Sequence, residues 1–161
     1  MRLTASEARR RFAAAPVVRL ATVSAEGIPH LVPITFAVVG ATAKTEADRI
    51  VFVVDDKPKS TTRLKRLANI AANPSVCVLA DVYDDDWSRL WWARADGTAR
   101  ILTEDEDEDE DADANADADE ETAAALDALA ARYPVYAGRR PRGPVVAIDV
   151  SDWTGWAARD A

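Results

Sequence analysis

Short apolar runs alternate with polar turns along most of this chain, and the runs rich in β-branched and aromatic residues predict strands. These runs span residues 17–23, 29–39, 50–55, 75–83, 87–102 and 145–150. The turn at residues 24–27 separates the first two runs, which predicts a hairpin. No strand–helix–strand repeat occurs. The pattern therefore predicts an α+β chain in which an antiparallel β-barrel carries peripheral helices.

Three stretches have helical rather than alternating spacing. The first opens on a capping box, Thr4 with Glu7, and should run to about residue 14. The second should run from about residue 61 to residue 72, where Asn73-Pro74 stops it. Its predicted apolar face consists of Leu64, Leu67, Ala68 and Ala71, and its basic positions Arg63, Lys65 and Arg66 are expected to lie off that face. The third covers residues 120–133.

The polar turn before the second helix offers candidate chemistry. Lys57, Lys59, Ser60 and Thr61 gather where the helix begins. A helix N-terminus has free backbone N–H groups and a partial positive charge, so this turn suits a phosphate or a carboxylate. The same residues are also typical of a solvated, capped helix start, and the spacing alone leaves both interpretations open.

The second apolar run contains Pro29 and Pro33, which have no backbone N–H to donate. This indicates an edge or bulged strand that a ligand could approach. Three tryptophans, Trp87, Trp91 and Trp92, lie within six residues. They predict either packing in a core or subunit interface, or a stacking wall for an aromatic ligand.

The length of 161 residues and the 48% hydrophobic content predict one domain over residues 1–161. The net charge of −8 is unevenly spread, because 13 of the 28 acids lie in residues 104–121 with no base among them. A low-complexity acidic insert at about 104–119 should be disordered or a solvated extension of the next helix. The rest of the chain contains 15 acidic and 20 basic residues. This small basic surplus does not predict nucleic-acid binding.

Several kinds of chemistry are not indicated by the sequence. The one cysteine, Cys77, and the one histidine, His30, cannot form a cysteine or histidine metal cluster, so no metal site is predicted. His30 is expected to be a surface or hydrogen-bonded residue. Glycine-rich phosphate loops and a nucleophile elbow are absent from the sequence. An enzyme of this composition would depend on an organic cofactor, and no side chain is assigned as catalytic.

The sequence also indicates the cellular compartment of the protein. No stretch approaches the roughly 20 apolar residues that span a bilayer. The N-terminus lacks the apolar segment of a signal peptide, and the lone cysteine leaves no disulfide framework. We therefore expect a cytoplasmic protein that does not bind membranes.

Five motifs in order resemble the coenzyme F420-dependent oxidoreductases of the pyridoxamine 5'-phosphate oxidase-like, FMN-binding split-barrel family. The motifs are Pro29-His-Leu-Val-Pro-Ile-Thr-Phe36, the basic turn and helix of residues 57–67, Asn69-Ile-Ala-Ala-Asn-Pro-Ser75, Asp84-Asp-Asp-Trp-Ser-Arg-Leu-Trp-Trp92 and Trp153-Thr-Gly-Trp156. The resemblance covers nearly the whole chain except the acidic insert.

The resemblance implies a split-barrel homodimer that holds coenzyme F420, or alternatively FMN, in a groove between subunits. In the family a basic residue, a spacer and a lysine hold the cofactor phosphate, and Lys57 and Lys59 occupy these places. Many relatives have arginine at position 57, whose guanidinium group can bind a phosphate through two parallel N–H groups. Lysine at this position offers a single ammonium charge instead. Ser60 and Thr61 fall where the phosphate site is completed. Val32, Pro33, Ile34 and Thr35 fall where the ring is lined.

The expected activity is hydride transfer from the reduced deazaflavin to an unsaturated or quinone-like small molecule. Two alternatives remain: an FMN-dependent reductase or oxidase of the same fold, and a non-catalytic carrier of a flavin or deazaflavin. The identity of the acceptor is not predicted, because folds of this kind vary on the substrate side.

Overall fold

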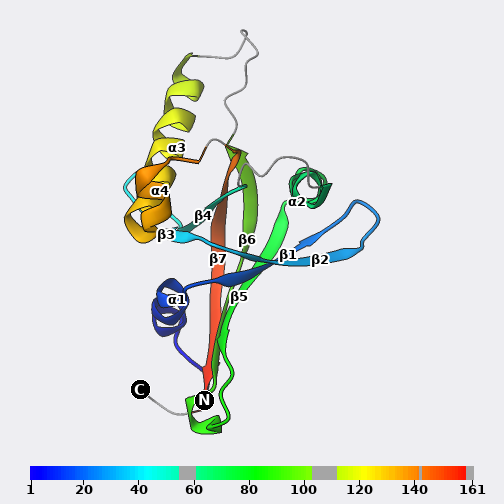
Figure 1. The fold of residues 1–161 in the computed structure, drawn as a ribbon, viewed down its shortest axis with the longest axis vertical. Coiled ribbons are helices and arrows are strands. Elements are labelled where there is room, and N and C mark those ends of the chain that lie inside the picture. The colour runs from blue at the N-terminus through cyan, green and yellow to red at the C-terminus, as the bar shows by residue number, and fades with distance from the viewer. Residues whose placement is uncertain (55–60, 103–111, 142, 159–161) are drawn as a thin grey trace.

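We analysed a computed structural model, which describes residues 1–54, 61–102, 112–141 and 143–158 (Figure 1). Seven strands form one antiparallel sheet in the order β2-β1-β5-β6-β7-β4-β3. The strands are β1 (Val18–Val23), β2 (Pro29–Ile34), β3 (Ala37–Val39), β4 (Arg49–Val53), β5 (Ser75–Val82), β6 (Trp91–Leu102) and β7 (Val145–Ala157). In Figure 1, β5, β6 and β7 run along the long axis, and the β1–β2 hairpin extends to one side.

The helices lie at three places around this sheet (Figure 1). They are α1 (Ala5–Ala14), α2 (Thr61–Ala72), α3 (Ala112–Arg132) and α4 (Pro134–Gly138), with a 3-10 turn, η1 (Trp87–Arg89). Helix α1 packs on β6 and β7, α2 lies beside the base of the β1–β2 hairpin, and α3 with α4 covers β3 and β4. Of the helices in the described residues, none is both long and apolar enough to cross a membrane.

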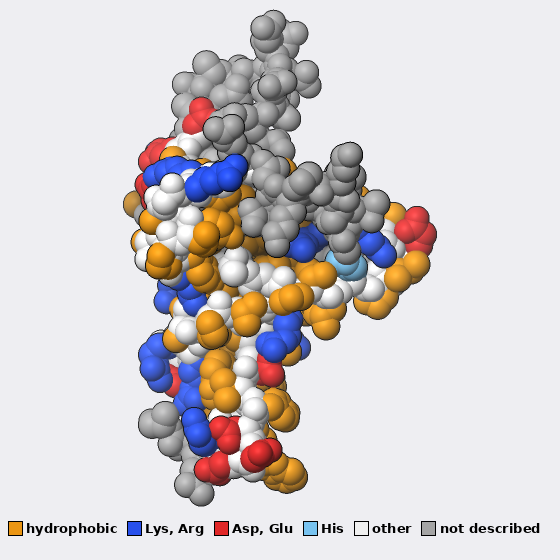
Figure 2. All heavy atoms as spheres, viewed as in Figure 1, with side chains coloured by type: hydrophobic (Ala, Val, Ile, Leu, Met, Phe, Trp, Pro, Cys, Tyr) orange, Lys and Arg blue, Asp and Glu red, His pale blue; other side chains and the backbone are white. Residues whose placement is uncertain are grey.

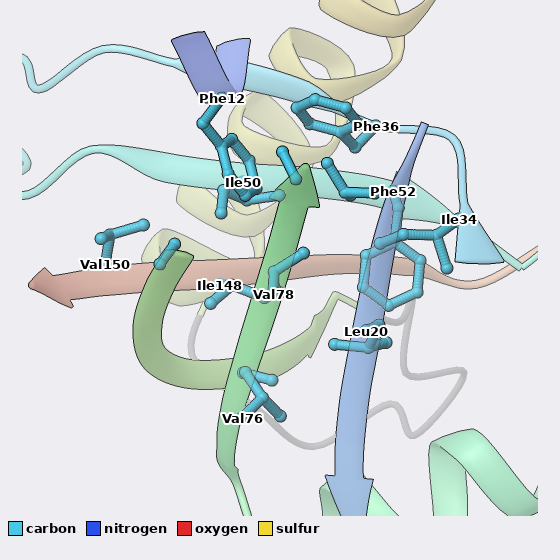
Figure 3. Close-up of a cluster of buried hydrophobic side chains, with 14 of the residues drawn as sticks. Phe12, Leu20, Ile34, Phe36, Ile50, Phe52, Val76, Val78, Ile148 and Val150 are labelled. Atoms are coloured by element: carbon cyan, nitrogen blue, oxygen red, sulfur yellow. The ribbon is translucent and has the colours of Figure 1, made fainter. Parts of the chain in front are cut away.

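The main core lies between the inward faces of the strands and helix α1. Side chains from helix α1 and from most of the strands meet there, as Figure 3 shows for Phe12, Leu20, Ile34, Phe36, Ile50, Phe52, Val76, Val78, Ile148 and Val150. The ring of Phe12 packs edge-on against Phe36 and Trp153, with centroids 5.1 Å apart in both pairs. This closed core confirms the predicted α+β architecture, an antiparallel split barrel with peripheral helices.

Strand β4 is buried on both faces, which explains its unbroken apolar sequence. Ile50 and Phe52 face the main core, whereas Val51 and Val53 join a second cluster under α3 that includes Leu129. The middle of α3 is held to the same region by charge. Its Glu121 accepts hydrogen bonds from the buried Arg49, at 2.7 Å, and from Arg100, which also binds Asp149.

The first helix begins as predicted. The hydroxyl of Thr4 accepts a hydrogen bond from the backbone N–H of Glu7 at 3.2 Å, and Ala8 and Phe12 are buried. The carboxylate of Glu7 does not return to the cap. It binds Arg10 and Arg11 on the same helix, because both guanidinium groups lie within one turn of it.

Three predicted boundaries were wrong. The run 29–39 is broken after Ile34, so it forms the two strands β2 and β3. Residues 87–89 form η1 rather than the start of a strand, because Asp86 caps that turn by accepting from the backbone N–H of Ser88 at 3.0 Å. The last strand continues to Ala157 instead of ending at residue 150, because it pairs with β6 along almost its whole length.

The acidic insert is described only in part. Helix α3 begins at Ala112 and not near residue 120, so residues 112–119 extend the helix, one of the two alternatives predicted for the acidic run. Residues 103–111 lie outside the described part of the chain.

Candidate functional site

The barrel is split between its two edge strands. β2 and β3 follow one another in sequence, yet they occupy opposite ends of the sheet order, and residues 35–36 connect them. The predicted edge position of Pro29 and Pro33 is therefore confirmed. We call residues 32–35, at the end of β2 and the start of this connection, the seam.

The four predicted ring-lining residues all lie at the seam, but on different sides of it. Ile34 is 6% exposed in the main core, and Val32 is half-buried against the same core. Pro33 points to the opposite face of β2 and is exposed, since side chains alternate along a strand. Thr35 is exposed where the chain leaves β2. The inner wall of the seam is thus Val32 and Ile34.

Two tyrosines from the C-terminal end of the α3–α4 region fix the backbone of the seam. The hydroxyl of Tyr133 accepts a hydrogen bond from the backbone N–H of Phe36 at 3.1 Å and donates to the carbonyl of Pro16 at 3.1 Å. The hydroxyl of Tyr136 lies 3.3 Å from the hydroxyl of Thr35. The two tyrosine rings pack edge-on, 5.8 Å apart. The seam is therefore held at a set position rather than left as a free loop.

Helix α2 lies against the hairpin at the same edge of the sheet. Its Asn69 donates a buried hydrogen bond of 3.1 Å to the hydroxyl of Thr22 on β1, and the two residues are 4% and 1% exposed. Thr22 pairs with His30 of β2, so both side chains face α2. His30 and Val32 lie two positions apart on β2 and share that face. The α2 contact and the seam are thus parts of one region.

The predicted buried face of α2 was wrong at Ala68 and Ala71. Asn69 and Ile70 are buried, whereas Ala68 and Ala71 are exposed, so the helix turns a partly polar face to the hairpin. Leu67 packs against the core as predicted, and Lys65 is exposed as predicted. Arg66, expected off the buried face, is half-buried.

Two basic side chains in this region have buried nitrogens without a hydrogen-bond partner in the described structure, Nδ1 of His30 and Nε of Arg66. Burial lowers the pKa of the Arg66 guanidinium, because the charged form loses water. His30 is half-buried, between the two predicted alternatives of a surface and a hydrogen-bonded residue, because its Nδ1 is buried without a partner. Unsatisfied buried polar groups are rare, and the N–H at Nε of Arg66 fits a molecule that brings an oxygen acceptor.

The predicted phosphate turn is not tested by the structure. Lys57, Lys59 and Ser60 lie outside the described residues. Thr61 begins α2 as predicted, although its side chain also lies outside the description. The described chain stops at Val54, whose backbone N–H donates to the carbonyl of Pro144, and resumes at the start of α2.

A groove of about 470 Å³ at another place is less suited to an anion. It lies between α1, β1 and the ends of β5 and β6, and its lining includes Arg10, Arg11, Arg19 and Trp91. Arg10 and Arg11 both bind Glu7, and Arg19 binds Asp81 at 2.6 Å. The charges of this groove are already paired, in contrast to Arg66. Among the described residues, no group of three or more His, Cys, Asp or Glu side chains could hold a metal.

A family model, described as pyridoxamine 5'-phosphate oxidase, matches residues 4–157. Similar solved structures include a FAD-binding protein from Mesorhizobium loti, with 19% identity, a TM-score of 0.65, and coverage of 96% of this chain and 95% of that one. A FAD-binding protein from Mycobacterium smegmatis has 17% identity, a TM-score of 0.54 and coverage of 99% and 100%.

A heme storage protein from Vibrio cholerae is also similar, with 13% identity, a TM-score of 0.57 and coverage of 94% of this chain and 90% of that one. At these identities the solved structures show the fold alone. The curated proteins include no match to this sequence.

Proposed function

Because the chain belongs to the pyridoxamine 5'-phosphate oxidase family, we propose that it is an oxidoreductase that uses coenzyme F420. The proposed reaction transfers a hydride to an unsaturated or quinone-like small molecule. The observation that carries the proposal is the seam, an edge of the barrel with an apolar inner side, beside a helix whose Arg66 has a buried Nε without a hydrogen-bond partner among the described residues. A planar ring joined to an anionic chain matches both features.

The residues of the seam would orient the ring. Val32 and Ile34 supply an apolar wall, and the hydrogen bonds of Tyr133 and Tyr136 keep residues 35–36 in place beside it. Lys57, Lys59, Ser60 and Thr61 are proposed to hold the phosphate, and this part rests on the family resemblance. When bound, the reduced cofactor supplies the hydride, so no side chain needs to act as a strong acid or base.

Both parts of this site are needed for affinity. Three charge-assisted hydrogen bonds at roughly 2 kcal/mol each give about 6 kcal/mol, whereas a micromolar complex requires about 8 kcal/mol after the costs of association. Burial of the ring against the seam would supply the remainder. A phosphate alone should therefore bind more weakly than the whole cofactor.

Two alternatives are compatible with the same fold. An FMN-dependent reductase or oxidase would use the same wall and phosphate turn. A non-catalytic carrier is favoured by the similarity to FAD-binding and heme storage proteins, because binding of a cofactor can be the whole function of such a fold.

We also propose that the protein is a homodimer. The outward positions of neighbouring strands carry exposed or half-buried apolar side chains, including Leu31 on β2, Leu79 on β5, and the cross-strand pair Trp92 and Trp156. Leu31 is 66% exposed and Trp156 is 38% exposed. An apolar surface of this kind marks an interface more often than a solvated face.

The test begins with the absorbance spectrum of the purified protein, followed by titration with coenzyme F420 and with FMN. Reduced coenzyme F420 is then mixed with a panel of enones and quinones, and its oxidation is followed by absorbance. We expect micromolar binding of coenzyme F420 and oxidation that depends on the protein. Tight FMN binding with FMN-dependent turnover would favour the first alternative. Binding without turnover of any acceptor would favour the carrier.

A further inference from the structure

We propose that Arg66 and His30 form an oxyanion-binding position on α2 and β2, which receives a phosphate or carboxylate group of the molecule that occupies the seam. The identity of that molecule rests on the proposed function. The anion chemistry does not, because it follows from described side chains alone.

Arg66 differs from the other arginines of similar burial. Six arginine side chains in the described part of the chain are buried or half-buried, and five have acceptors within the structure. Arg9 binds Asp48, Arg11 binds Glu7, Arg49 and Arg100 bind Glu121, and Arg132 binds the carbonyls of Ala13 and Ala15. Arg66 has no such acceptor among these described residues, and its Nε is buried.

Among the described elements packed against α2, no acid is free to pair with Arg66. Helix α2 and strands β1 and β2 have neither aspartate nor glutamate in their sequences, and Asp96 of β6 is already bound to Arg94 at 2.9 Å. A half-buried guanidinium whose buried N–H has no acceptor is unfavourable, and proteins ordinarily pair or hydrogen-bond such groups. A bound anion would supply the acceptor that these elements lack.

A shared anchor places His30 and Arg66 on the same side of the sheet. The Asn69–Thr22 hydrogen bond fixes α2 on β1. Arg66 lies one helical turn before Asn69 on the same side of α2, and His30 pairs with Thr22 across the strands. In Figure 2 the single histidine, in pale blue, lies at the surface with basic side chains on both sides of it.

The chemistry of these groups selects an oxyanion. A guanidinium group has donors and no acceptor, and an imidazole nitrogen that carries a proton also donates. Arginine binds phosphate and carboxylate through parallel N–H groups, which gives both affinity and orientation. Because His30 shares its face with Val32, an anion held here would lie at one end of the seam, where it would position a ring against Val32 and Ile34.

The first experiment measures thermal unfolding of the cofactor-free protein with increasing inorganic phosphate or glutarate, against chloride at equal ionic strength. We expect saturable stabilisation of the wild-type protein, since an anion that binds only the folded state raises its stability. The probe that saturates at the lower concentration identifies phosphate or carboxylate as the preferred group. Stabilisation by neither probe would overturn the proposal.

Two variants locate the effect. Arg66→Gln should weaken binding of the preferred anion, and so raise its saturation midpoint, by roughly 10- to 150-fold. This is the change expected for loss of one charge-assisted hydrogen bond. Lys65→Gln removes the same charge from the adjacent, exposed position and should leave the saturation midpoint unchanged. Equal weakening in both variants would show general electrostatics and would overturn the specific role of Arg66.

A third variant separates binding from structure. Arg66→Met keeps a long apolar side chain and removes the unpaired charge, so the anion-free protein should unfold at a higher temperature than wild type. A purely structural arginine would instead give a lower unfolding temperature. Higher stability together with a lost anion response is the expected signature, and a lower unfolding temperature with an intact response would contradict it.

These results can be told apart from failure of the proposed function. If neither coenzyme F420 nor FMN binds, but the preferred anion stabilises wild type and not Arg66→Gln, the anion position stands and the proposed function fails. If a cofactor binds Arg66→Gln as tightly as wild type and the anion response is also unchanged, the anion position fails and the proposed function stands.

Discussion

The carboxylate of Asp48 accepts hydrogen bonds from three directions. Arg9 of α1 binds it at 2.6 Å, the indole N–H of Trp153 on β7 at 3.2 Å, and the backbone N–H of Ala41 at 3.3 Å. These donors lower the pKa of Asp48, with the bond from Arg9 as the largest cause. A single residue thereby joins a helix, a loop and a strand. Arg66 is the opposite case, a charge that the described chain leaves unpaired.

At the same scale, Lys57→Ala and Lys59→Ala should each weaken cofactor binding without unfolding the protein. Loss of one charge-assisted contact to a phosphate should cost about 1.5–3 kcal/mol, or roughly 10- to 150-fold in dissociation constant. Fluorescence titration with coenzyme F420 measures the change. Lys44→Ala, which removes an exposed lysine paired with Glu120, is the matched control and should bind normally. Normal affinity in all three variants would place the phosphate elsewhere.

Helix α3 is attached to the barrel through one of two adjacent glutamates. Glu121 is 17% exposed in its side chain and binds Arg49 and Arg100, whereas Glu120 is 73% exposed and pairs with Lys44. Below this charge contact, Ala125 and Leu129 are buried against β3, β4 and β7. The buried contacts hold the helix, and this helix leads into Tyr133 and the seam.

The two glutamates should therefore respond differently to neutralisation. Glu121→Gln leaves the buried Arg49 without a counterion and should lower the free energy of unfolding by about 3 kcal/mol. Glu120→Gln removes an exposed ion pair and should cost less than about 1 kcal/mol. Urea unfolding of both variants checks this difference. Equal losses would mean that α3 is not held by the Glu121 contact.

In the whole molecule, carboxylates paired with arginines make the folding stability depend on pH in the acidic range. Hydrogen bonds from Arg10 and Arg11 hold the pKa of Glu7 at about 2, and Arg100 and Arg49 lower that of Glu121. A carboxylate whose pKa is lower in the folded state than in the unfolded state stabilises the protein when the pH is above the unfolded-state pKa. This stabilisation is lost as the pH falls toward and through the folded-state pKa.

We therefore expect an unfolding temperature that changes little between about pH 7 and pH 5 and falls below the ordinary glutamate value of 4.5 toward pH 2. Scanning calorimetry across this range measures it. Glu121→Gln should show a shallower fall, because one titrating group is removed. A loss of stability between pH 7 and pH 5 would point to other groups.

The proposed homodimer should link assembly to cofactor binding. If each seam is completed by the second subunit, the two-fold axis places both sites between the chains. Light scattering of the free and cofactor-saturated protein should give a dimer, and dilution should release cofactor and subunits together. A monomer that binds cofactor at full affinity would refute the shared site.

Local patterns in the sequence determined most of the elements. The capping box at Thr4 marked the start of α1, Asn73-Pro74 marked the end of α2, and the prolines of β2 indicated an edge strand. Each of these signals acts within a few residues, through backbone N–H groups that are present or missing. The antiparallel barrel followed from the order of the short apolar runs. The phosphate turn was proposed from the sequence and still awaits a test.

Only the tertiary structure decided which side chains meet. The contact of Asn69 with Thr22 joins residues 47 positions apart, and that of Thr35 with Tyr136 joins residues 101 positions apart. Helical periodicity placed Ala68 and Ala71 on the buried face of α2, but packing against the sheet buried Asn69 and Ile70 and half-buried Arg66. Periodicity describes one element, whereas burial and pairing depend on the surface that a distant segment brings against it.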